Sequence, residues 1–191
     1  MELQEAIKGR RSIRKFTNEP VDKEVLREIL ETAVWAPSAQ NFQPWYLLAL
    51  TDPQDLRDLF DILGTSAFSH RKKLEERFKN NPEVVEETME FAREMGGATA
   101  IVLCFLRKDT FTGTDLLDCK ESVAAAANDI CLLAYEKGLA TCWVNEVCRE
   151  GEKLRERFAP DKGDLVCGIV MGHPAMEARE IKRKPGTIEI R

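Results

Sequence analysis

Residues 9–16, GRRSIRKF, concentrate cationic side chains in a chain that is otherwise acidic. Four of these eight residues are Lys or Arg and none is acidic, whereas the whole chain of 191 residues has a formal net charge of -5. A second basic group, REIKRK at residues 179–184, lies near the other end of the sequence. Guanidinium groups bind phosphate oxygens through paired hydrogen bonds. Together the two groups suit a compact anion such as a phosphate, although each alone is more typical of a solvated surface.

A second segment whose side chains could bind a ligand is APSAQNFQPW, residues 36–45. Its side-chain amides, those of Gln40, Asn41 and Gln43, stand between two prolines. An amide offers both donors and an acceptor, so such a loop can recognise the polar edge of a heterocycle. Alone, the same pattern is that of an ordinary polar connection between a helix and a strand.

Other catalytic arrangements are not indicated by the sequence. The chain has two histidines, His70 and His173, to neither of which we assign a role, and no Ser–His–Asp, Cys–His or paired-carboxylate pattern stands out. The six cysteines are scattered without a C-x-x-C pair, which predicts reduced, mostly buried thiols rather than a zinc or iron–sulfur site. A redox pair of Cys142 and Cys148 is a less favoured alternative. No Rossmann or P-loop fingerprint occurs.

The composition predicts one globular domain, residues 1–191, with 43% hydrophobic and 32% charged residues. The longest apolar run, AIVLCFL, is too short to cross a bilayer. The N-terminus, MELQEAIKGRR, contains acidic residues and no apolar stretch of a secretory signal. We therefore expect a cytoplasmic protein that binds no membrane. Because the two basic groups are short and lie near the ends of an acidic body, we also expect no nucleic acid partner.

The apolar spacing predicts helices and strands in mixed order, an α+β fold in which helices cover a sheet. Asp22 is expected to cap a helix that Pro37 stops, and Gly64 to close the helix after Asp52. The tail GTIEIR alternates like a strand but has no neighbour in sequence with which to pair, so we expect it to dock on another chain's sheet. Strands are expected at residues 45–50, 98–106, 141–145 and 165–172, and helices before residue 9, in two pieces over 65–96, at 115–137 and around 154–158.

Four segments, in this order, resemble the nitroreductase family of flavin oxidoreductases. RRSIRKF and APSAQNFQPW resemble its N-terminal signature, AAAANDICLLAYEKGLATCWV its long central helix and following strand, and GIVMGHPA followed by KRKP its C-terminal end. The resemblance is weakest across residues 65–96, which we expect to form a variable helical lid. It implies a mixed, mostly antiparallel central sheet flanked by helices. It also implies an intertwined homodimer in which the C-terminal strand is exchanged.

The same resemblance implies an FMN in a cleft at the dimer interface, contacted by both chains. Arg10 would pair with the phosphate, helped by the second basic group. Arg14 would lie beside the N1/O2 edge of the flavin, where reduction places negative charge. A fixed cation at this edge favours the reduced anion. The cofactor-binding residues expected from the two basic groups are Arg10, Arg11, Ser12, Arg14, Arg183 and Lys184.

The remaining implied contacts come from the amide segment and from the turn after WV. Asn41 would bond the pyrimidine edge, while Pro37, Ser38 and Ala39 would come from the opposite chain and cover the ring. Backbone N–H groups of Val144, Asn145 and Glu146 would approach flavin N5. Many members have Gly in this turn, where this chain has VNEV. Asn145 can tolerate a left-handed conformation, which would keep the turn.

The implied activity is an FMN-dependent oxidoreductase that takes hydride from NADH or NADPH. The acceptor would be a small electron-poor molecule such as a nitroaromatic or a quinone, and one shared site predicts ping-pong kinetics. The flavin carries the electron transfer, so no catalytic side chain is expected beyond electrostatic support from Arg14. Alternatives are a specialised member that acts as a dehydrogenase, dehalogenase or flavin-processing enzyme, a flavin-binding protein without turnover, and a helical protein whose basic ends contact an acidic partner.

Overall fold

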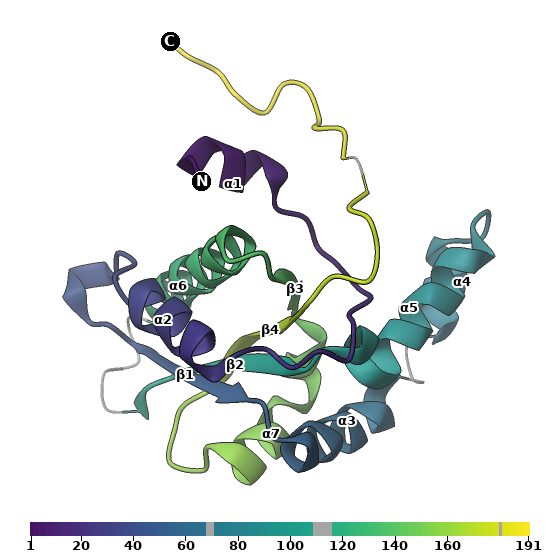
Figure 1. The fold of residues 1–191 in the computed structure, drawn as a ribbon, viewed down its shortest axis with the longest axis horizontal. Helices are drawn as coiled ribbons and strands as arrows, with labels where there is room; N and C mark the ends of the chain where they lie inside the picture. The colour runs from purple at the N-terminus through teal and green to yellow at the C-terminus, as the bar shows by residue number, and fades with distance from the viewer. Residues whose placement is uncertain (68–70, 109–115, 180) are drawn as a thin grey trace.

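The computed structural model describes residues 1–67, 71–108, 116–179 and 181–191, and a four-stranded sheet lies at its centre (Figure 1). Neighbouring strands are antiparallel throughout, in the spatial order β1-β2-β4-β3. The expected α+β class is confirmed, whereas an exchanged C-terminal strand stays a prediction. The strands are β1 (Trp45–Leu50), β2 (Ala100–Leu106), β3 (Ala140–Val144) and β4 (Leu165–Gly172).

Helices cover both faces of this sheet, and two of them project from the body (Figure 1). The described helices are α1 (Leu3–Gly9), α2 (Lys23–Ala33), α3 (Pro53–Ala67), α4 (Arg71–Arg77), α5 (Pro82–Glu94), α6 (Leu116–Glu136) and α7 (Gly151–Phe158). Short 3-10 turns are η1 (Ala39–Asn41), η3 (Met95–Gly97) and η5 (Glu146–Glu150). The expectation that Gly64 closes its helix is wrong, because α3 continues to Ala67. Asp115 and His70 lie outside the described residues.

Two helix ends form as the sequence predicts. Asp22 caps α2, since its carboxylate accepts hydrogen bonds from the backbone N–H groups of Glu24 (2.7 Å) and Val25 (3.1 Å). At the end of α6, Gly138 has a φ of 78° and the N–H of Leu139 bonds the carbonyl of Ala134 at 2.9 Å. This is the Schellman arrangement, which turns the chain directly into β3.

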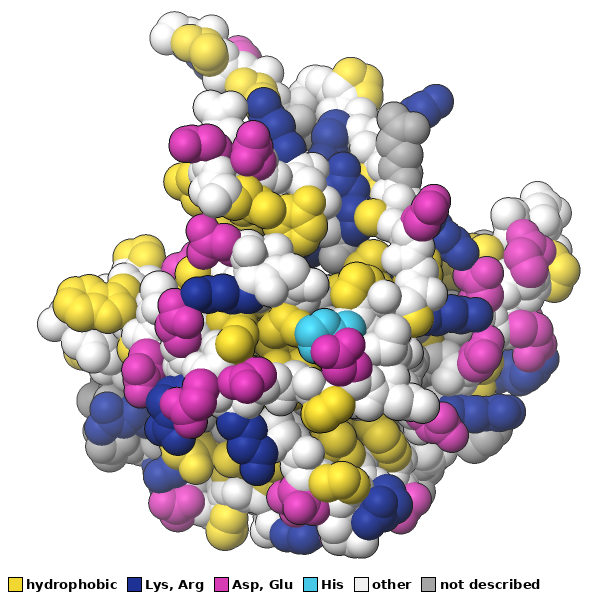
Figure 2. Space-filling view, viewed as in Figure 1, with side chains coloured by type: hydrophobic (Ala, Val, Ile, Leu, Met, Phe, Trp, Pro, Cys, Tyr) yellow, Lys and Arg dark blue, Asp and Glu magenta, His cyan; other side chains and the backbone are white. Residues whose placement is uncertain are grey.

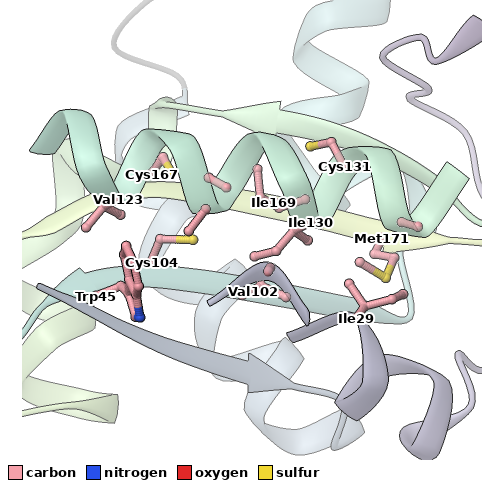
Figure 3. Packing of buried hydrophobic residues seen from close by; sticks show 14 of the residues in the cluster. Ile29, Trp45, Val102, Cys104, Val123, Ile130, Cys131, Cys167, Ile169 and Met171 are labelled. Atoms are coloured by element: carbon pink, nitrogen blue, oxygen red, sulfur yellow. The ribbon is translucent and has the colours of Figure 1, made fainter. Parts of the chain in front are cut away.

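The core consists of two layers, one on each face of the sheet. On one face, alternate residues of β2 and β4 pack against α2 and the small-residue face of α6 (Figure 3). On the other face, the intervening residues pack against α3 and α7. Because Ala126, Ala127 and Ala134 are fully buried, α6 approaches the sheet closely. All six cysteines are free thiols, as expected, and five of them are buried.

Beyond β4 the chain leaves the sheet and runs outward as an exposed tail (Figure 1). Residues 185–191 form no strand within this chain, and Ile188 and Ile190 are 85% and 93% exposed. Docking of this tail on another chain therefore stays a prediction. Among the helices of the described ranges, none is long and apolar enough to cross a membrane.

Candidate functional site

The N-terminal arginine segment, residues 10–16, crosses the edge of the sheet beside β3 and the chain after β4. The N–H of Ile13 bonds the carbonyl of Thr141 at 3.0 Å, so the segment begins alongside the outer edge of β3. The N–H of Phe16 bonds the carbonyl of Gly96, and the N–H of Ala175 bonds the carbonyl of Lys15, both at 2.9 Å. The segment is therefore fixed by backbone hydrogen bonds to three separate parts of the fold.

The arginines of this segment have different surroundings. The guanidinium of Arg11 donates to the carbonyls of Lys8 (2.6 Å) and Arg10 (2.8 Å), and so completes the end of α1. In the described parts of the chain, the guanidinium groups of Arg10 and Arg14 have no hydrogen-bond or ion-pair partner. Arg10 is only half-exposed. Arg10 and Arg14 therefore remain available to an anion, whereas Arg11 serves the local structure.

Burial raises the pKa of three thiols, those of Cys131, Cys142 and Cys148. Burial raises the pKa of Cys131 to about 11, although the positive charge of Arg10 opposes the rise. Burial also raises the pKa of Cys142, opposed mainly by the charge of Arg14, and burial raises the pKa of Cys148 to about 11. A neutral thiol is a poor nucleophile, so the surroundings argue against the alternative of a reactive redox pair.

A cavity of about 220 Å³ lies between the arginine segment, the end of α6, the start of β3 and the chain after β4. Gly9 and Tyr135 both line this cavity, and a Cβ at position 9 would lie 2.4 Å from the hydroxyl of Tyr135. Ligand pockets commonly measure about 300–1,000 Å³, so this cavity holds part of a large cofactor at most. The lining residues are Gly9, Arg10, Arg11, Ile13, Tyr135, Gly138, Leu139, Ala140, Thr141, Pro174, Met176 and Ala178.

The amide loop, residues 37–43, is folded by polar contacts of its own and of α6. Its residues Gln40, Asn41 and Gln43 all have left-handed backbone, with φ of 48°, 57° and 47°. Such conformations cost about 1–3 kcal/mol each and persist where surrounding contacts impose them. Here the N–H of Ala39 bonds the buried hydroxyl of Ser122 on α6 at 3.1 Å. The loop is therefore a constrained structure and not an open connection.

Two further bonds within the loop orient its side chains. The N–H of Gln43 bonds the hydroxyl of Ser38 at 3.1 Å, and the amide nitrogen of Gln43 donates to Oδ1 of Asn41 at 2.9 Å. Both amides are exposed to solvent.

Within one chain the two halves of the predicted site lie at opposite ends of α6. The amide loop contacts Ser122 near the start of this helix, whereas Gly9 faces Tyr135 near its end. At 1.5 Å per residue, the helix axis between Ser122 and Tyr135 measures roughly 20 Å. Figure 1 shows the same separation, with the loop before β1 and the arginine segment on opposite sides of the view. One chain therefore does not bring Arg10 and Asn41 together.

The turn after β3 is held by a side-chain bond that the sequence did not indicate. The indole N–H of Trp143 donates to Oδ1 of Asn145 at 2.7 Å. Asn145 does not use the left-handed conformation that it can tolerate, since its φ and ψ are -85° and -10°. Glu146 forms an ion pair with Arg149 at 2.8 Å, and the Val144 side chain is buried, so only the backbone of Val144 can face a ligand.

The second basic group is exposed and partly engaged elsewhere. Arg179 pairs with Glu87 of α5 at 2.8 Å, which ties the tail to this helix. Arg183 and Lys184 are exposed, and among the described residues their side chains form no hydrogen bond or ion pair with the arginine segment. Figure 2 shows Lys and Arg side chains gathered between α1 and the tail. Their expected role at the phosphate stays a prediction.

Several residues of this arrangement were missed by sequence reasoning: Ser122, Tyr135, Trp143 and Gln43 as an orienting partner. A buried serine within the apolar face of α6 was the available signal for Ser122. The described residues contain no group of three or more His, Cys, Asp or Glu side chains suited to a metal, and the expectation of no metal stays a prediction.

Comparisons with known proteins give a consistent result. The model of the "Nitroreductase family" matches residues 7–173. The protein YfhC of Bacillus subtilis (strain 168) is 27% identical over 185 residues, which cover 95% of this chain and 89% of YfhC.

Solved structures give a similar result. A crystal structure from Desulfovibrio desulfuricans in complex with FMN is 26% identical with a TM-score of 0.74, covering 100% of this chain and 96% of the other. The FMN-dependent nitroreductase NfnB from Mycobacterium smegmatis, in complex with NADPH, has a TM-score of 0.75 at 19% identity, covering 98% and 97%.

Proposed function

The chain belongs to the nitroreductase family, and on this premise we propose that it is an FMN-dependent NAD(P)H oxidoreductase acting on small electron-poor acceptors. The observation that carries the proposal is the guanidinium of Arg10 at a cavity on the edge of the sheet, with that of Arg14 further along the same segment, because neither has a hydrogen-bond or ion-pair partner among the described residues. The FMN complex of the Desulfovibrio relative and the NADPH complex of NfnB support the choice of cofactor and hydride donor.

The residues present fit an FMN. A phosphate requires cationic donors without internal partners, and Arg10 meets this requirement. The ring edge requires amide or backbone donors, and Asn41 stands in a preformed loop. The cavity of about 220 Å³ is too small for the whole cofactor, so further walls must come from outside this chain.

A homodimer supplies those walls. Ser122, which contacts the amide loop, and Tyr135, which faces Gly9, lie roughly 20 Å apart along α6 in one chain, so we propose that the two halves around one flavin come from different copies. We propose that Pro37, Ser38, Ala39 and Asn41 of one copy face Arg10 and its neighbours in the other. The exposed alternation of Ile188 and Ile190 suits a tail that adds to the partner's sheet.

The chain's contribution to the reaction is binding, orientation and electrostatics. Bound FMN supplies the hydride chemistry, accepting from the nicotinamide and donating to the acceptor. Arg10, with Arg183 and Lys184 of the tail, holds the phosphate. Arg14 places a fixed positive charge beside the ring, which stabilises negative charge that develops there. Backbone N–H groups of Val144, Asn145 and Glu146 face the central ring.

Both substrates are proposed to use one site in turn. The sequence has no second nucleotide-binding fingerprint, so nicotinamide and acceptor would stack on the same face and give ping-pong kinetics. Intersecting initial-rate patterns would contradict this. We propose nitroaromatics and quinones as the first acceptors to test. We also propose that the protein acts in the cytoplasm, and that the chain forms one domain in which residues 65–96 act as a lid.

The decisive experiment is an absorption spectrum of the protein purified with FMN available, followed by anaerobic titration with NADH and NADPH. We expect a yellow protein that is bleached by at least one nicotinamide and reoxidised by a nitroaromatic or a quinone. A colourless protein would contradict the proposal. A yellow protein that no nicotinamide bleaches would favour the specialised or non-catalytic alternatives.

A further inference from the structure

The amide loop contains a hydrogen bond between two solvent-exposed side chains, those of Gln43 and Asn41. Nε2 of Gln43 donates to Oδ1 of Asn41 at 2.9 Å, and both residues have left-handed backbone. The backbone of Gln43 is itself fixed by the hydroxyl of Ser38. A strained backbone that brings two exposed amides together points to a function for their orientation.

The bond decides which face of the Asn41 amide a ligand meets. An amide has an oxygen that accepts and a nitrogen that donates two hydrogens. With Oδ1 engaged by Gln43, the Nδ2 hydrogens remain, and in the described parts of the chain they have no partner. Asn41 is therefore prepared as a donor.

We propose that Gln43 is a positioning residue that makes Asn41 donate to a carbonyl oxygen of the flavin pyrimidine edge and not accept from its N3–H. The inference rests on the proposed function, in which Asn41 faces that edge. Electron density on the pyrimidine carbonyl oxygens rises when the ring is reduced. A fixed donor there stabilises the reduced state more than the oxidised state, and so raises the midpoint potential of bound FMN.

The chain offers a matched control for this role. Gln40 lies in the same loop, has a similar φ of 48° and is equally exposed. Its side chain makes no hydrogen bond within the described part of the chain. Substitutions at Gln40 therefore reproduce changes in charge and loop strain without changing the Asn41 amide.

The test compares Gln43→Glu and Gln43→Met with Gln40→Glu and Gln40→Met in the FMN-loaded protein. A carboxylate at position 43 accepts from Nδ2 of Asn41 and turns its oxygen toward the ring, so we expect FMN to dissociate roughly tenfold more readily and its midpoint potential to fall. Gln43→Met should weaken binding roughly threefold. Both Gln40 variants should stay within twofold of wild type. In an Asn41→Ala background, Gln43→Met should have no further effect.

Three results would overturn the inference alone: a wild-type-like Gln43→Met protein, equal effects of Glu at positions 40 and 43, or an effect of Gln43→Met that persists in the Asn41→Ala background. A wild-type protein that binds no FMN would instead overturn the proposed function, and the inference with it. Thermal melting of each variant detects a folding defect. The midpoint potential detects a change at the flavin, because a purely structural role would not shift it.

Discussion

Ser122 and Tyr135 lie on the same helix, α6, and each contacts one half of the predicted flavin site. The hydroxyl of Ser122 accepts the N–H of Ala39 in the amide loop, while Tyr135 faces Gly9 just before the arginine segment. The helix thus sets the spacing between the two halves at roughly 20 Å within a chain. In a symmetric dimer, the same helix in each copy would fix where the loop of one meets the arginines of the other.

Ser122→Ala is expected to loosen the amide loop. Ser122 is 5% exposed, and its loss leaves the N–H of Ala39 without a partner, which costs about 1–3 kcal/mol. We expect a lower melting temperature and faster release of FMN. Thr32→Ala, which removes a hydroxyl bonded to a helix carbonyl on the exposed side of α2, is the control. Unchanged FMN release in the Ser122 variant would show that the loop does not cover the flavin.

Arg10→Ala is expected to weaken FMN binding roughly 10- to 100-fold, the range for loss of charged hydrogen bonds to a phosphate. Riboflavin has the same ring without the phosphate, so its affinity should change little. Titration of both flavins, monitored by fluorescence, tests this directly. Arg27→Ala, which removes an exposed arginine on α2, is the control. Equal losses for FMN and riboflavin would place Arg10 at the ring and not at the phosphate.

Trp143→Phe is expected to disorder the turn after β3 while preserving most of the packing. The indole N–H that bonds Asn145 is lost, at a cost of about 1 kcal/mol, and the backbone donors of the turn lose their fixed position. We expect roughly fivefold slower reduction by the nicotinamide in stopped-flow measurements, with FMN affinity nearly unchanged. Trp35→Phe is the control, since Trp35 is 87% exposed. Identical rates in both variants would remove Trp143 from the site.

Local features of the fold could be predicted because neighbouring residues determine them. The cap at Asp22 and the end of α6 at Gly138 depend on residues within one turn, and both form as expected. Gly64 was mistaken for a helix end because glycine costs a helix only about 1 kcal/mol, which the buried Leu59 and Leu63 of α3 offset.

The site could be predicted only in part, for a related reason. The residue types of the arginine segment and the amide loop are visible in sequence, whereas the second chain that the resemblance implies stays a prediction. The contacts of Ser122, Tyr135 and Trp143 could not be predicted from the sequence, because they depend on the packing of segments that lie far apart in the chain or on the direction of a side chain. The backbone of Asn145 follows the η5 turn and the indole of Trp143, which override its tolerance for left-handed conformations.

Gly9→Ala is expected to destabilise the protein by about 1–3 kcal/mol. The new Cβ would lie 2.4 Å from the hydroxyl and 2.9 Å from Cζ of Tyr135, so either the ring of Tyr135 or α1 must shift. Tyr135→Phe in the same protein should restore part of the loss. Gly64→Ala is the contrasting control, because no atom lies within 4 Å of its added Cβ, and alanine should stabilise α3 by about 0.5–1 kcal/mol. Denaturant unfolding measures all three variants, and a neutral Gly9→Ala would contradict the close approach.

Stability is expected to fall in alkaline solution partly through Cys131. Burial raises the pKa of this thiol from 9.0 to about 11 in the folded protein. Below pH 9 the thiol is protonated in both states and stability is unaffected. Between about pH 9 and 11 the unfolded thiol ionises while the folded one does not, so the unfolded state binds fewer protons and the free energy of unfolding decreases. Two pH units correspond to about 2–3 kcal/mol.

Cys131→Ala isolates this contribution from other groups that titrate in the same range. Denaturant unfolding at pH 7, 9 and 10.5 should show a smaller alkaline loss for the variant than for wild type, whatever its stability at pH 7. Parallel pH profiles would mean that the thiol ionises equally easily in both states. The positive charge of Arg10 opposes the rise, so Arg10→Ala should raise the pKa of Cys131 in the folded protein further. The free energy of unfolding should then keep decreasing up to a higher pH than in wild type.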